Sequence, residues 1–244
     1  MTLDRASGID LTDRAYRSLR RMIESGAMPP RLKLSHRTLS RDLKIGRSPV
    51  RDALLRLEAE GLIEHRPGSG IYLRDISPAE LRHVYELRIL NEPHFAGEAA
   101  RHATAAQRAK LARLCDRMAA NARRPDLTQW LASRENVRGV ARLDIEFHTT
   151  VLEASANPVA ARIFSSPNIL ALSFAWDLLF MKPEWLAEVA ERSCAGHRAV
   201  ERAIRRRAAD AAAAAMRDHL IWGRREVPEH YAALAGTKSV HRRP

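Results

Sequence analysis

Two side chains with metal-binding chemistry lie four residues apart in the helical pattern LDIEFHTTVLEASAN. Asp144 and His148 would therefore share one face of a helix. Two further histidines follow, His197 in GHRAVERAI and His219 in MRDHL. Three imidazoles and one carboxylate would suit Zn²⁺, Ni²⁺ or a similar divalent ion, with coordination positions left open for a ligand. The chain has 10 histidines, so this spacing alone does not separate a metal site from a chance pair.

A second group of side chains could read DNA. Arg47 and Arg51 lie four residues apart at the front of a helical pattern that ends at Gly61. An arginine can pair with the O6 and N7 edge of guanine, and the neighbouring Ser48 can donate to a phosphate. Arg37 stands at the front of the preceding helical pattern, within reach of the DNA backbone or groove. The alternative is that these arginines form a solvated basic face.

A helix-turn-helix with a wing is the arrangement that would position these arginines. The predicted elements are a helix at 37–43, a turn at 44–46, a helix from 47, a strand at 62–64, a turn at 67–70 and a strand at 71–73. In such a unit the first residues of the second helix contact base edges in the major groove. Gly68 and Gly70 let the wing turn tightly and approach a phosphate or the minor groove.

The rest of the chain is predicted to be helical, so the fold class is mainly α. Residues 1–74 are expected to form the DNA-binding domain, with a loose arm at 1–10 and a first helix at 12–25; residues 75–77 are a linker. A helical bundle is expected over 78–227, and 228–244 should be a frayed tail. The predicted helices of the bundle cover 78–102, 104–122, 127–155, 158–165, 168–181, 183–206 and 208–223.

The overall composition indicates a polyanionic partner. The chain of 244 residues has a net charge of +12, and residues 1–74 contain 15 Lys and Arg against 9 Asp and Glu. Double-stranded DNA is the usual partner of such a charge, although Arg-rich chains are also common where the genome is rich in G and C. Two cysteines are too few for a disulfide framework. With neither a signal-peptide pattern nor an apolar run long enough for a membrane span, a cytoplasmic protein is expected.

The string IGRSPVRDALLRLEAEGLIEHRPGSGIYL resembles the GntR family of bacterial transcription regulators. The resemblance implies a winged helix-turn-helix whose DNA contacts are Arg37, Arg47, Ser48, Arg51, Gly68 and Gly70. The chain departs from the common pattern at four positions: His36, Gly46, Ser48 and Asp52. These departures leave the predicted fold intact and could change which operator is read.

Most of residues 80–222 resembles the FCD ligand-binding domain of the FadR-type GntR subfamily, an antiparallel bundle of six to seven helices. This resemblance implies that a divalent metal ion is held by Asp144, His148, His197 and His219. The segment YELRILNEPHFAGEAARHAT matches the opening helix, with Arg88 and Glu92 in the expected places. Arg88 would bind an anionic effector, or would form a structural ion pair with Glu92. Gly196 stands where the pattern often has Glu.

Arg142 is a second candidate for binding the effector, because it closely precedes Asp144. It also belongs to a stripe with Arg134 and Arg138 at a spacing of four residues, which is typical of a solvated helix face.

These expectations combine into a homodimeric regulator that binds a near-palindromic operator. A small carboxylate bound beside the metal would change its DNA affinity, usually by relieving repression. A sensor of the metal alone and a metal-dependent hydrolase are the alternatives. A hydrolase would need a general base near the metal-bound water, and Glu146 should point away from the neighbouring ligands. An enzyme is therefore not expected.

Overall fold

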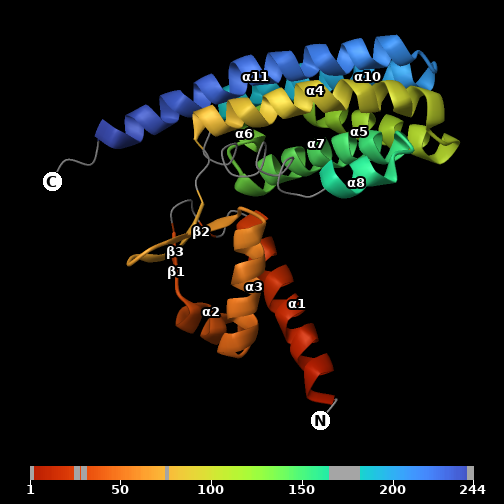
Figure 1. Ribbon diagram of the computed structural model, residues 1–244. Helices are drawn as coiled ribbons and strands as arrows, with labels where there is room; N and C mark the ends of the chain where they lie inside the picture. Colours follow the sequence, from red (N-terminus) through yellow and green to blue (C-terminus); the bar gives the residue numbers. More distant parts are fainter. Residues whose placement is uncertain (1–2, 25–27, 29–31, 75–76, 165–181, 241–244) are drawn as a thin grey trace. The chain divides into compact units, whose positions relative to one another are not determined.

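The computed structural model describes residues 3–24, 28, 32–74, 77–164 and 182–240 (Figure 1). The chain divides after Asp75 into two units. The helix predicted at 168–181 lies outside the described residues. Within the described part, no helix is both long and apolar enough to cross a lipid bilayer.

The first unit is a winged helix-turn-helix. Its helices are α1 (Leu3–Glu24), α2 (His36–Leu43) and α3 (Arg47–Ala59), and its strands are β1 (Lys33–Leu34), β2 (Ile63–Arg66) and β3 (Gly70–Leu73). The strands form an antiparallel sheet in the order β1-β3-β2. Helix α1 begins at Leu3, so the prediction of a loose arm at 1–10 was wrong. The two-residue strand β1 was also missed, because two residues carry no detectable alternation.

The pattern of burial explains which face of α3 remains exposed to solvent. Val50, Ala53, Leu54 and Leu57 are at most 1% exposed, and their spacing places them on one side of the helix. Helix α2 begins at the cap residue Ser35, whose hydroxyl accepts a hydrogen bond from a backbone N–H of the first turn. Because the apolar side of α3 faces the core of the unit, its first polar side chains are exposed to solvent.

The second unit is an all-helical bundle. Its helices are α4 (Pro78–His102), α5 (Ala105–Ala122), α6 (Leu127–Trp130), α7 (Arg134–Ala154), α8 (Pro158–Phe164), α10 (Pro183–Arg205) and α11 (Ala209–Val240). Helix α4 lies along α11, as Figure 1 shows. It begins with a capping box between Ser77 and Glu80, which fixes its first turn.

Glycine permits the close approach of α4 and α11. A Cβ atom on Gly223 of α11 would lie 2.7 Å from a ring carbon, Cε1, of Tyr85 on α4. Real Cβ atoms essentially never come this close to another heavy atom. Tyr85 is 2% exposed and belongs to the core of the bundle, so its ring fills the space that a side chain at 223 would need.

Two helices differ from the prediction. The helix expected over 127–155 is broken between Trp130 and Arg134, where the side-chain amide of Asn136 donates to the carbonyl of Trp130 at 2.8 Å. The frayed tail expected at 228–244 is wrong for residues 228–240, since α11 continues through Pro228 to Val240; the last four residues lie outside the described part. Val227 and Pro228 are buried in the bundle, and their burial outweighs the backbone hydrogen bond that proline cannot make.

Candidate metal centre and nucleic-acid interface

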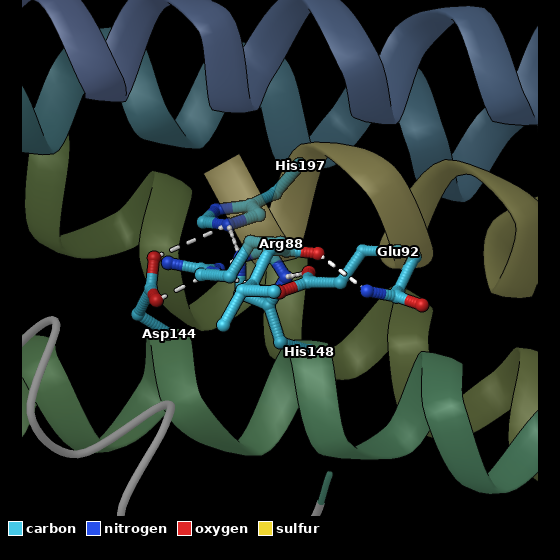
Figure 2. Close-up of polar contacts among 7 residues, drawn as sticks. Arg88, Glu92, Asp144, His148 and His197 are labelled. Atoms are coloured by element: carbon cyan, nitrogen blue, oxygen red, sulfur yellow. Dashed lines mark hydrogen bonds and ion pairs between the residues drawn. The ribbon is translucent and has the colours of Figure 1, made fainter. Parts of the chain in front are cut away.

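Three helices bring the four predicted metal ligands together. Helix α7 carries Asp144 and His148, α10 carries His197 and α11 carries His219. One ligand atom from each side chain lies within 4.8 Å of the others. Asp144, His148 and His197 are at most 6% exposed, and Figure 2 shows them converging between the helices. Residues separated by up to 75 positions in sequence thus meet at one point.

The distances between donor atoms match the needs of a small divalent ion. Nε2 of His197 lies 3.2 Å from Nε2 of His148 and 3.2 Å from Oδ1 of Asp144, and Nε2 of His148 lies 3.7 Å from Oδ2 of Asp144. Ligands at roughly 2.1 Å from a tetrahedral ion are separated by about 3.4 Å. The ring of His219 completes the group, 4.4 Å from the His197 ring and 5.4 Å from the His148 ring between centroids.

Buried polar atoms provide an independent test of this fit. Oδ2 of Asp144 and Nδ1 of His197 are buried and have no hydrogen-bond partner among the residues that the structure describes. Leaving a buried carboxylate oxygen without a hydrogen bond costs free energy, which a bound cation would offset. Three nitrogen donors and one oxygen donor are a set that zinc and nickel accept. The residues present therefore fit a divalent metal ion.

The protonation states in the cluster also favour metal binding. Burial raises the pKa of Asp144, but His148 and His197 outweigh it and hold that pKa well below its usual range. Burial lowers the pKa of His197 and of His219 from the ordinary histidine value. At neutral pH the carboxylate is therefore ionised and these two imidazoles are neutral. Those are the forms that bind a metal ion.

Glu92 is a functional residue that the sequence did not assign to this site. Its Oε1 accepts from Nε of Arg88 at 2.5 Å, and its Oε2 accepts from Nδ1 of His148 at 2.6 Å (Figure 2). Burial raises the pKa of Glu92, but Arg88 and His148 outweigh it and lower that pKa to about 2. In the neutral tautomer that donates from Nδ1 to Glu92, Nε2 of His148 carries the lone pair that a metal would need.

Arg88 lies in the core of the bundle beside the cluster, with its side chain only 1% exposed. The structure contains the ion pair with Glu92 that the sequence left as an alternative. The guanidinium carbon also lies 5.4 Å from the centre of the Tyr85 ring. Although burial opposes its charge, Glu92 and its other neighbours raise the pKa of Arg88, which therefore stays cationic.

Arg142 does not join this cluster. Its side chain is exposed on α7, whereas Asp144 and His148 on the same helix are buried. A separation of two residues turns the helix by about 200°, so Arg142 and Asp144 point in nearly opposite directions. Arg142 and Arg134 are thus exposed as the stripe indicated, whereas Arg138 is half-buried and its Nε is shielded from solvent.

The predicted DNA contacts lie on the surface of the first unit. Arg37 is the second residue of α2, and Arg47, Ser48 and Arg51 occupy the first turns of α3; all four are exposed. Among the residues that the structure describes, Arg51 has only a loose, exposed ion pair with its neighbour Asp52, at 3.6 Å. These side chains are therefore available to bases and phosphates.

The wing has the backbone geometry that its glycines permit. Gly68 has φ of +69° and Gly70 has φ of +123°, values that residues with a side chain rarely adopt. Within the wing, Arg66 lies next to the turn, and its guanidinium carbon is 4.5 Å from the centre of the Tyr72 ring. Sequence reasoning did not assign a role to Arg66.

Comparisons with known proteins agree with this architecture. Residues 11–73 match the model of the bacterial regulatory proteins of the gntR family, and residues 83–221 match the FCD domain. An HTH-type transcriptional regulator of Agrobacterium vitis, from the TAR-I ttuE-ttuC' intergenic region, is 29% identical over 63% of this chain and 85% of its own length. The Exu regulon transcriptional regulator of Escherichia coli is 26% identical over 83% of this chain and 78% of its own length.

The fold is also similar to that of a solved bacterial protein. The solved structure of Escherichia coli McbR/YncC superposes with a TM-score of 0.68 and 17% identity, covering 91% of this chain and 98% of that one. The two family models together cover the helix-turn-helix and most of the helical bundle. This chain therefore belongs to the gntR family of bacterial regulatory proteins, in the group that carries an FCD domain, and it is a transcriptional regulator rather than an enzyme.

Proposed function

We propose that this regulator changes its affinity for DNA when a small carboxylate binds beside a divalent metal ion in the FCD domain. The observation that carries this proposal is the cluster formed by the buried Asp144, His148 and His197 with the half-buried His219, whose ligand atoms lie within 4.8 Å of one another. Zinc or nickel would suit these donors. The protein supplies four ligands. An ion that accepts five or six donors therefore keeps one or two coordination positions for an effector.

Arg88 provides the second part of the effector site. It is a buried cation linked through Glu92 to the metal ligand His148. The planar guanidinium of arginine suits the two oxygens of a carboxylate. One oxygen of a carboxylate would thus bind the metal ion, and the other oxygen would accept a hydrogen bond from Arg88. Arg142 is not part of this proposal, because its side chain lies on the solvated surface.

At the other end of the chain, the exposed Arg37, Arg47, Ser48 and Arg51, together with the wing glycines Gly68 and Gly70, would contact the operator. Arg47 and Arg51 stand at the start of α3, where the residues of a recognition helix meet base edges. A homodimer would present two such units to the two halves of a near-palindromic operator. Repression relieved by the effector is the direction we propose.

The experiment measures operator affinity by fluorescence anisotropy with DNA from upstream of the protein's own gene. Three samples are compared: protein stripped with EDTA, protein with Zn²⁺ or Ni²⁺, and metal-loaded protein with sugar acids or dicarboxylates. We expect at least one carboxylate to change the affinity only when metal is bound. If no acid changes the affinity while metal alone does, the protein is a metal sensor without an organic effector. If neither changes it, the proposed control is wrong.

Two variants separate the parts of the site. His148→Ala should lower metal content while leaving operator binding by the metal-free protein unchanged, because His148 belongs to the second unit. Arg88→Lys keeps the charge and removes the planar fork, so it should weaken the response to a carboxylate more than it weakens metal binding. Full metal occupancy in the His148 variant would contradict the assigned ligands.

A hydrolytic site is disfavoured by the surroundings of the cluster. Glu146, the carboxylate between the two α7 ligands, lies 3.5 Å from Nζ of Lys110 on α5, and its side chain is 39% exposed. It is therefore turned toward a surface lysine rather than toward the buried ligands. This placement agrees with the family, whose members are transcriptional regulators.

A further inference from the structure

Gly196 leaves a space on α10 that the side chain of His219 occupies. A Cβ atom built on Gly196 would lie 2.7 Å from Nδ1, 3.1 Å from Cγ and 3.2 Å from Cβ of His219. All three nearest atoms belong to that one histidine. The imidazole thus rests directly against the backbone of α10, one residue before the metal ligand His197.

His219 is half-buried, and its imidazole lies between Gly196 and two other rings of the cluster. Besides Gly196, its ring meets the rings of His197 and His148, with centroids 4.4 Å and 5.4 Å away. Its own backbone is held by its neighbours on α11, because Met216 and Leu220 are at most 1% exposed. A methyl group at 196 would therefore push the imidazole out of its present position relative to the other ligands.

We infer that Gly196 is a positioning residue of the metal centre: by lacking a side chain, it lets His219 complete the group of four ligands. This inference rests on the proposed metal site. The related pattern often has Glu at this position, and that side chain would not fit beside His219 as placed here. In this chain the position of His219 thus requires that residue 196 has no side chain. The glycine therefore does more than remove a side-chain contact near the metal.

The test compares Gly196→Ala with Gly139→Ala. Both glycines lie inside helices, and a Cβ atom on Gly139 would have no heavy atom within 4 Å. Zn²⁺ affinity is measured by competition with a chromogenic chelator, and thermal unfolding in EDTA checks that both variants are folded. We expect Gly196→Ala to lower the affinity by roughly 10–100-fold, the range seen when the support of a metal ligand is lost. Gly139→Ala should leave it nearly unchanged.

A double-mutant cycle shows whether Gly196 acts through His219. In a His219→Ala background, Gly196→Ala should cause no further loss of Zn²⁺ affinity, because the displaced ring is absent. An equal loss in both backgrounds would overturn the inference, since it would mean that the methyl group damages α10 generally. An unchanged affinity in the single variant would also overturn it.

A measurement without metal keeps the inference separate from the proposed function. In EDTA, the ring proton resonances of His219 should shift in Gly196→Ala and stay in place in Gly139→Ala. If the wild-type protein binds no Zn²⁺ but this shift is seen, the proposed metal control fails while the placement of His219 by Gly196 stands. If the His219 resonances do not move, the inference fails.

Discussion

Replacing Glu92 by Gln removes the charge that links Arg88 to His148 and keeps the size of the side chain. The pKa of Glu92 lies at about 2 instead of the ordinary 4.5, and the side chain is 16% exposed. Each tenfold change in an acid constant corresponds to about 1.4 kcal/mol. Ionised Glu92 therefore stabilises the metal-free protein by about 3 kcal/mol at neutral pH, which the variant should lose.

The sign of the pH dependence follows from the lowered pKa. The stabilisation is fully present above the unfolded pKa near 4.5, and it is lost as the pH falls toward the folded value of about 2. The difference between wild type and Glu92→Gln should therefore fall from about 3 kcal/mol at pH 7 to about 2 kcal/mol near pH 3.5. Over this range the variant should lose about 1 kcal/mol less stability than the wild type, while the lowered pKa values of His197 and His219 destabilise both proteins equally as the pH falls.

Urea unfolding in EDTA, followed by tryptophan fluorescence, measures this difference. All four tryptophans follow residue 129, so the signal reports the second unit only. Glu98→Gln is a matched control on the same helix, because Glu98 pairs with the exposed Arg101 at 2.6 Å. The Glu98→Gln variant should lose less than about 1 kcal/mol of unfolding free energy. A Glu92 variant as stable as the wild type at pH 7, or a difference that does not shrink in acid, would refute the reasoning.

Three further predictions concern separate parts of the molecule. Arg51→Ala should weaken specific operator binding by about 1–3 kcal/mol in fluorescence anisotropy, and an unchanged affinity would show that another face of α3 meets the bases. Gly139→Ala should raise the free energy of unfolding by about 0.5–1 kcal/mol, because alanine favours a helix and its methyl group meets no neighbour. Cys115 is fully buried, and burial raises its pKa to about 12. Iodoacetamide should therefore alkylate the partly exposed Cys194 first in the native protein. Equal alkylation rates at the two cysteines would contradict this placement.

Apart from the start of α1 and the short strand β1, the local pattern predicted the winged helix-turn-helix. The apolar spacing in α3 predicted its buried face, and Gly61 and the wing glycines marked where the chain turns. The tail was mispredicted because Pro228 is a reliable helix breaker only where nothing else holds the helix. Here Val227 is 5% exposed and Tyr231 packs against the core, so tertiary packing carries α11 past the proline.

The grouping of Asp144, His148, His197 and His219 was predictable from resemblance, whereas its surroundings were not. The sequence shows Arg88 and Glu92 four residues apart, and that pair was expected. It does not show that Glu92 also meets His148, because that contact joins residues 56 positions apart on different helices. For the same reason Gly196 could be noted as a departure, but its contact with His219 depends on how α10 and α11 pack.

The contact between Gly223 and Tyr85 restricts how this protein can diverge. A methyl group at 223 would strike the buried ring 2.7 Å away, and neither helix can retreat without opening the core of the bundle. Single substitutions at 223 are therefore expected to be removed by selection, while a smaller residue at 85 would make them tolerable. In an alignment of close relatives, these two columns should change together, so that a tyrosine at 85 predicts a glycine at 223.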